Sequence, residues 1–161
     1  MLTSWRFKTA ALLTLLVVVS VFTGAAHALE SRTGHDNGIS WYVAVGDFDW
    51  NSTDTYSWHE VFLNNTSDVL GTAYWGWWHT VVNVNTGQEM RWDKVTGGGD
   101  MSPGATVERS GWLNADISGL RNDRQYRIKG ETYVRIHPPR KEDGASIRRE
   151  VIDWSRRFWK D

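Results

Sequence analysis

The stretch 126–137, which reads YRIKGETYVRIH, decides the class of fold. Apolar and small side chains occupy every second position, beginning with Tyr126 and Ile128, and mainly charged or polar side chains occupy the positions between, beginning with Arg127 and Lys129. A helix would scatter both sets around its circumference, whereas a β-strand sends them to opposite faces. The stretch is therefore predicted to be a strand with one buried face.

The same two-residue period continues along most of the chain on the N-terminal side of this strand. Strands are predicted at 41–45, 58–63, 71–84, 88–95 and 106–117. The segment 96–104 is rich in glycine and other breakers and is predicted to be a loop. Short strands at this spacing, with almost no helical stretch, predict an all-β sandwich or barrel.

The residues just before 126–137 separate these two architectures. Leu120 lies six positions before Tyr126, and a turn-forming Asn122-Asp123 pair lies between them. This pattern resembles the tyrosine corner of immunoglobulin-like and fibronectin type III domains, in which the tyrosine hydroxyl bonds to backbone a few residues upstream. The resemblance implies a single immunoglobulin-like Greek-key β-sandwich of about seven strands. Because the chain has no cysteine, it implies a member without the disulfide.

The C-terminal segment fits two structures. Its apolar residues are spaced as one stripe of an amphipathic helix, flanked by arginines that would contact an anionic membrane surface. That stripe consists of Ile147, Val151, Trp154 and Phe158. A sandwich whose preceding strand ends near His137 instead needs a further strand to pair with it. A strand at about 145–154 is the preferred prediction, and the Arg-rich helix is the alternative.

The first 28 residues have the pattern of a secretory signal peptide. Arg6 and Lys8 precede a long apolar run, and Ala26-His27-Ala28 supplies the small residues of a cleavage site. A retained membrane anchor is the less favoured alternative, because the apolar run is only marginally long enough to span a bilayer. Cleavage would leave one domain at 29–161, exported to the periplasm, the cell surface or the medium.

Composition excludes several classes of protein. The 161 residues include 18 Lys and Arg, 19 Asp and Glu, 11 Trp and no Cys. A thiol enzyme and a cysteine zinc site are thus excluded, and the near-neutral balance argues against nucleic acid as a partner. Each buried tryptophan removes roughly 150 to 250 Å² from water. One buried layer cannot hold all of them, so some are expected to face outward.

The aromatic run within 71–84 supplies the candidate binding site. Tyr74 and Trp78 are predicted to lie on one face of this strand, and the other aromatic side chains on the opposite face. Since a sandwich strand normally buries only one face, one of the two sets is expected to be exposed or covered by a loop. An exposed set would be a platform that stacks on a sugar or enters a partner's pocket. A strand covered on both sides by the Gly-rich loop is the slightly preferred interpretation, and the platform is the functional alternative. The predicted binding residues are Trp75, Trp77 and His79, with Trp50 and Trp92 as auxiliary contacts from loops.

Oxygen-bearing side chains alternate along the segment 47–54. They are Asp47, Asp49, Asn51 and Asp54. Ca²⁺ takes about 6 to 8 oxygen ligands, so this segment is a candidate calcium loop. The EF-hand pattern fails, because Ser52 replaces the turn glycine and Trp58 stands in the place of the bidentate Glu. A solvated turn is the preferred interpretation, and no other cofactor is predicted.

No catalytic motif accompanies the candidate acids and bases. Those candidates are Glu60, Glu131 and Asp116 as glycosidase carboxylates, and His59 or His79 as a base. Nucleophile elbow, zinc-protease and phosphate-loop motifs are all missing from the sequence. The sequence therefore predicts an exported, non-catalytic binding module for a carbohydrate or protein ligand. A membrane-active protein and a self-assembling structural subunit are the alternatives.

Overall fold

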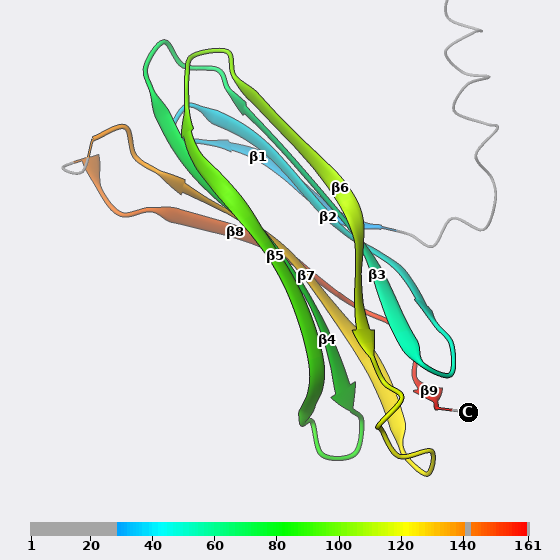
Figure 1. Ribbon diagram of the computed structural model, residues 1–161. Coiled ribbons are helices and arrows are strands. Elements are labelled where there is room, and N and C mark those ends of the chain that lie inside the picture. Colours follow the sequence, from blue (N-terminus) through cyan, green and yellow to red (C-terminus); the bar gives the residue numbers. More distant parts are fainter. Residues whose placement is uncertain (1–28, 141–142, 161) are drawn as a thin grey trace, which may run out of the picture.

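The computed structural model describes residues 29–140 and 143–160, and the predicted signal peptide lies outside the described residues. The strands are β1 (Glu30–Asp36), β2 (Ile39–Trp50), β3 (Asp54–Asn65), β4 (Gly71–Asn83), β5 (Glu89–Met101), β6 (Thr106–Asp116), β7 (Gln125–His137), β8 (Ile147–Trp154) and β9 (Phe158–Trp159). They form two antiparallel sheets, in the orders β1-β2-β3-β6 and β5-β4-β7-β8, and β9 also pairs with β7 (Figure 1). The predicted all-β sandwich is confirmed.

The connections run repeatedly between the two sheets. The chain leaves the first sheet after β3, returns to it at β6 and leaves it again for β7, so that β6 lies beside β3 and β7 beside β4. Crossings of this kind are typical of Greek-key sandwiches. The described residues contain two strands more than the predicted seven, because β1 precedes the first predicted strand and the short β9 follows the last.

Strand β7 has the two faces that its sequence predicts. Side chains from Tyr126 to Ile136 are buried at every second position, and those between them are exposed or half-buried. Ile128, Val134 and Ile136 are completely buried in the core between the sheets. Burying one such aliphatic side chain stabilises the fold by about 1.5 to 3 kcal/mol, which makes β7 a central element of the core.

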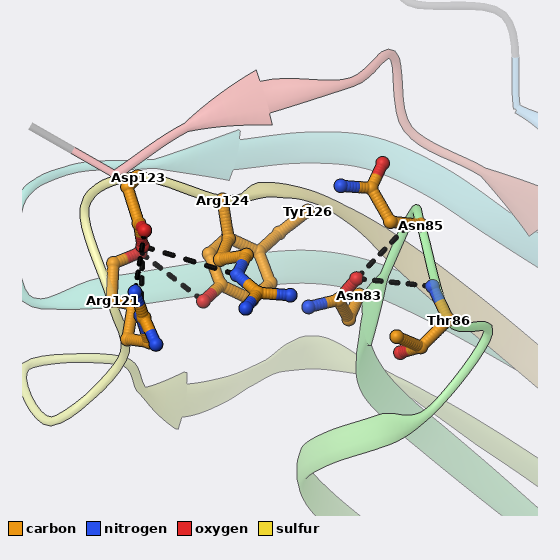
Figure 2. Close-up of polar contacts among 7 residues, drawn as sticks. All are labelled: Asn83, Asn85, Thr86, Arg121, Asp123, Arg124 and Tyr126. Atoms are coloured by element: carbon orange, nitrogen blue, oxygen red, sulfur yellow. Dashed lines mark hydrogen bonds and ion pairs between the residues drawn. The ribbon is translucent and has the colours of Figure 1, made fainter.

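The contact implied by the tyrosine-corner pattern is present. The Tyr126 hydroxyl donates to the Arg121 carbonyl at 3.2 Å (Figure 2). Figure 2 also shows the neighbouring β4–β5 turn, where the Asn83 side-chain oxygen accepts the backbone N–H groups of Asn85 and Thr86 at 2.9 and 3.2 Å. Polar side chains therefore close both connections at this end of the sandwich.

The prediction of a loop at 96–104 is wrong for 96–101, because β5 continues through the glycines to Met101. A Cβ atom at Gly97 would lie 2.7 Å from the Trp75 ring, and one at Gly98 would lie 2.3 Å from the Ala73 carbonyl oxygen. These positions are glycine because other groups approach the backbone closely. Glycine, which often ends a strand at a turn, lies here within a strand.

Replacing Gly98 by alanine is expected to destabilise the sandwich strongly. Gly98 has a φ of 126°, and an added Cβ would also lie 2.5 Å from the Tyr74 Cα. Gly99 has a φ of 147° but has nothing within 4 Å of an added Cβ. Urea unfolding of Gly98→Ala should show a free energy of unfolding about 1 to 3 kcal/mol below that of Gly99→Ala, since only the former adds overpacking to backbone strain. Equal losses would contradict this packing.

The C-terminal segment adopts the preferred strand, β8, and not the helix. Two of its arginines are held by carboxylates. Arg149 forms a two-bonded ion pair with Asp36 of β1, with both N···O distances 2.9 Å, and Arg148 pairs with Glu131 and Glu150. The guanidinium of Arg149 lowers the pKa of the Asp36 carboxyl. These charges link β8 to its neighbours.

Candidate functional site

The predicted binding platform faces the wrong way. Trp75, Trp77 and His79 do share one face of β4, but that face is buried between the sheets. Room for the Trp75 indole comes from Gly97, and a Cβ atom added at Gly111 of β6 would lie 3.5 Å from the Trp77 ring. The expectation that these three side chains are exposed is therefore wrong, and the aromatic surface must be sought on the other face of the strand.

His79 is buried because hydroxyl groups of β3 satisfy its ring. Its Nε2 lies 2.8 Å from the Thr55 hydroxyl and its Nδ1 lies 2.7 Å from the Ser57 hydroxyl. Ser57 also lies 2.8 Å from Nε2 of His59, whose Nδ1 lies 2.9 Å from the Thr132 hydroxyl of β7. A continuous chain of polar side chains thus crosses the core and joins the two sheets.

The ends of this polar chain fix the direction of its hydrogen bonds. Thr132 donates to the Ala44 carbonyl at 2.8 Å, so its hydroxyl oxygen accepts the proton of His59 Nδ1. Ser57 then donates to His59 Nε2 and accepts from His79 Nδ1. The Thr55 hydroxyl lies 2.8 Å from His79 Nε2 and 3.3 Å from the Ala115 carbonyl, and its single proton forms the shorter bond, to Nε2. Each imidazole is consequently neutral and carries its proton on Nδ1.

Burial keeps both rings uncharged. Loss of hydration lowers the pKa of His79 to about 4, and loss of hydration together with the neighbouring His79 lowers the pKa of His59 to about 3. Both side chains are fully shielded from solvent, so neither is placed to act as a base on a dissolved substrate. Their role in the structure is to bridge the sheets.

The replacement Thr132→Val is expected to lower the free energy of unfolding by about 2 to 3 kcal/mol. Valine has nearly the same shape but leaves Nδ1 of His59 without a partner in the core, and an unsatisfied buried polar group carries its full desolvation cost. Thr72→Val is the matched control, because Thr72 is only half-buried and bonds to the exposed Asp100. Urea unfolding should separate the two variants, and similar small losses would contradict the proposed chain.

The exposed aromatic surface lies on the outer face of the sheet β5-β4-β7-β8. Tyr74 and Trp78 of β4 are 44% and 38% exposed, and Trp92 of the adjacent β5 is 60% exposed. The ammonium of Lys94 lies 5.3 Å from the Trp78 ring centroid and 5.7 Å from that of Trp92. Cation–π contacts of this length hold the two indoles and the charge together on the surface.

A groove of about 520 Å³ crosses this face, and we call it the Tyr74 groove. Its lining residues are Tyr74, Trp75, Thr96, Gly97, Gly98, Tyr133, Arg135 and His137. Gly98 lies directly opposite Tyr74 and carries no side chain, which leaves the groove open beside the Tyr74 ring. The volume falls within the roughly 300 to 1,000 Å³ of ordinary small-ligand sites.

Rings and a cation form the sides of the Tyr74 groove. The Tyr74 ring packs edge-on against His137 with centroids 5.5 Å apart. The Tyr133 ring covers Gly76, and the Arg148 guanidinium lies 4.0 Å from its centroid. Arg135 is exposed beside Tyr74. The groove therefore combines apolar ring surface with hydrogen-bond donors, as sites for polar organic ligands do.

The two auxiliary tryptophans have different positions. Trp92 is exposed on the same sheet face as Tyr74 and Trp78, although it lies in a strand and not in a loop. Trp50 also ends a strand, is half-buried, and stacks on Phe158 with ring centroids 4.7 Å apart. Only Trp92 is thus positioned to join a binding surface with Tyr74.

The candidate calcium ligands do not converge. Asp47 and Asp49 lie in β2 at a β-bulge, and not in a loop. The Asn51 side-chain oxygen already accepts bonds from the backbone N–H groups of Thr53 and Asp54, each at 2.8 Å. Among residues 29–140 and 143–160, no group of three or more His, Cys, Asp or Glu side chains is arranged to hold a metal ion.

The three candidate glycosidase carboxylates lie apart. Glu60 is on the outer face of the first sheet and accepts the indole N–H of Trp58 at 2.9 Å. Glu131 is in the second sheet, paired with Arg148. Asp116 ends β6, and its bond from Ser118 lowers its pKa. No two of them face each other across one site.

Two residues of the groove, Tyr133 and Arg135, are not among those predicted from the sequence, and they alternate with the buried side chains of β7. Gly98 carries the signal that could have found them, because a glycine directly opposite Tyr74 leaves a hollow beside that ring, and Arg135 lies opposite Tyr74 on the other side. That signal becomes visible only when the strand register is known.

Comparisons with known proteins add little. No family model matches the chain, and no curated protein sequence matches it. A crystal structure of a protein from Archaeoglobus fulgidus is similar at a TM-score of 0.40 and 12% identity, over 83% of this chain and 96% of that one. Within the part of the chain that the structure describes, there is no helix with the length and apolar character needed to cross a membrane. The fold and the surface define an all-β sandwich with an aromatic, cation-bearing outer face.

Proposed function

We propose that the protein is an exported, non-catalytic binding module that holds a carbohydrate on the outer face of β5-β4-β7-β8. The observation that carries the proposal is the set of exposed rings on this face, Tyr74, Trp78 and Trp92, beside a groove with glycine at its floor. A sugar ring has flat C–H faces that pack on aromatic rings, and its hydroxyls need the polar groups that surround them.

Export and membership of the immunoglobulin-like class belong to the same proposal. The signal-peptide pattern at 1–28 supports export. The bond from the Tyr126 hydroxyl to the Arg121 carbonyl supports the comparison with immunoglobulin-like domains. Such domains commonly present a surface for binding, but fold alone does not determine function, so the aromatic face remains the main support.

Tryptophan fluorescence, titrated with a panel of neutral and charged oligosaccharides, tests the proposed function. Trp78 and Trp92 are exposed indoles on the proposed surface, so a bound sugar should change the emission of the protein. We expect a saturable change with at least one member of the panel. A flat response to every saccharide, confirmed by calorimetry, would contradict carbohydrate binding and leave a protein ligand as the alternative.

A further inference from the structure

We propose that the Tyr74 groove binds an acidic saccharide, with the carboxylate of a uronic acid residue held by Arg135. This inference rests on the proposed function and names its class of ligand. The groove is bordered by an exposed arginine, Arg135, whose charge a neutral sugar would not use.

Arg135 has no carboxylate partner among the described residues. The ion pairs between side chains of this sheet join Glu131 to Lys129 and to Arg148, and Glu150 to Arg148. Arg135 is exposed, and it borders the groove. A free guanidinium at the edge of a hollow can form two parallel hydrogen bonds to a carboxylate, which is the geometry that arginine provides better than lysine.

The cross-strand neighbours of Arg135 strengthen the argument. On one side it lies directly opposite Arg148, and like charges in this position destabilise a sheet. Arg148 is neutralised by Glu131 and Glu150, whereas Arg135 is not. Such a local conflict is expected where a site has a function, and here a bound anion would relieve it.

On its other side Arg135 lies directly opposite Tyr74. Side chains in this relation have Cβ atoms roughly 4.5 to 5.5 Å apart. The carboxylate of a uronic acid projects from the rim of its pyranose ring. A sugar that stacks on the exposed Tyr74 ring can therefore direct that carboxylate toward Arg135, whereas a small inorganic anion would leave the aromatic surface uncovered.

The remaining charged and titratable groups around the groove are compatible with this ligand. His137 stands beside Tyr74 as a further hydrogen-bonding group. Asp100 lies at the same end, opposite Thr72, whose hydroxyl donates to it at 2.7 Å. Asp100 lies two residues further along the sheet than Arg135. Its negative charge would repel a bound carboxylate, so the ligand's carboxylate is expected on the Arg135 side of Tyr74.

The test uses fragments of polygalacturonate, alginate and hyaluronan, each compared with its carboxyl-reduced form. Calorimetry on the wild-type protein is expected to give at least tenfold tighter binding to one acidic fragment than to its reduced form, with a loss of affinity as salt is raised. Arg135→Gln should weaken binding of the acid by about 10- to 100-fold and leave the reduced form unaffected. Arg109→Gln, at an exposed arginine of the first sheet, is the control.

Three outcomes would overturn the inference. Equal affinity for acidic and reduced fragments would do so while leaving the proposed carbohydrate function intact. Failure to bind any of the three acids would also overturn the inference. Binding of the neutral oligosaccharides would then test the proposed carbohydrate function separately. Equally tight, Arg135-dependent binding of a single-stranded oligothymidylate would show a general polyanion site. On the wild-type protein, the comparison of each acidic fragment with its reduced form and with oligothymidylate tests the class of ligand even if Arg135→Gln is poorly folded.

Discussion

Lowering the pH from 7 to 5 is expected to reduce the free energy of unfolding by about 4 kcal/mol, which is a large share of the roughly 5 to 15 kcal/mol of an ordinary domain. The cause is the pair His59 and His79 in the core, whose pKa values fall from 6.5 to about 3 and about 4 on folding. Each contributes about 2 kcal/mol of the loss at pH 5.

The direction follows from which state binds the proton. Below pH 6.5 the histidines of the unfolded chain become protonated, while His59 and His79 of the folded chain stay neutral. Stability is therefore complete above pH 6.5, falls as the pH decreases, and stops falling through these groups near pH 3. The pKa values of the Asp36 and Asp116 carboxyls are also lowered on folding, so any loss of stability through their protonation occurs only at more acidic pH.

Urea unfolding at pH 7, 6 and 5 measures this dependence. In the double variant His59→Gln/His79→Gln the loss between pH 7 and 5 should fall below about 1 kcal/mol, because glutamine does not titrate. NMR of the wild-type imidazoles gives an independent measurement, in which both rings should remain neutral Nδ1–H tautomers down to pH 5. Titration of either ring near pH 6 would contradict the closed hydrogen-bonded chain, whether or not the variant folds.

The double variant Tyr74→Ala/Trp78→Ala is expected to weaken saccharide binding about 100-fold or more. Both rings are on the outer face of β4, four residues apart along the strand, and both are available to contact one ligand. Truncating an aromatic residue at the centre of a binding surface typically costs about 2 kcal/mol or more. Calorimetry with the tightest saccharide of the panel measures the effect.

Trp112→Ala is the matched control for this variant. Trp112 is 51% exposed, but it lies in β6 of the first sheet, packed edge-on against Trp58. Its removal should change the affinity less than twofold and should leave the unfolding midpoint close to that of the wild type. If Trp112→Ala weakens binding as much as the double variant does, the site is on the first sheet and the proposed surface is wrong.

The strands could be predicted where periodicity and burial agree, as they do in β7. Its alternation of Ile128, Thr132 and Val134 with charged residues has only one amphipathic interpretation as a strand. In β4 the same period correctly divides the residues into two faces, yet both faces are aromatic. Local sequence alone then cannot decide which face is buried.

The choice in β4 depends on residues far away in the sequence. His79 is acceptable in the core only because Thr55 and Ser57, 24 and 22 residues earlier, bond to its ring. Trp75 fits only because Gly97 stands beside it. The glycines of β5 pose the same problem, because a close contact within a strand and a turn both favour glycine, and local sequence does not distinguish them.

Hydroxyl-radical footprinting of the protein, with and without its tightest-binding saccharide, tests most directly where the ligand lies. If the outer face of β5-β4-β7-β8 is the binding surface, Tyr74, Trp78 and Trp92 should become protected, while Trp112 on the opposite sheet should react as before. Protection of Trp112 without protection of Tyr74 and Trp78 would contradict the account.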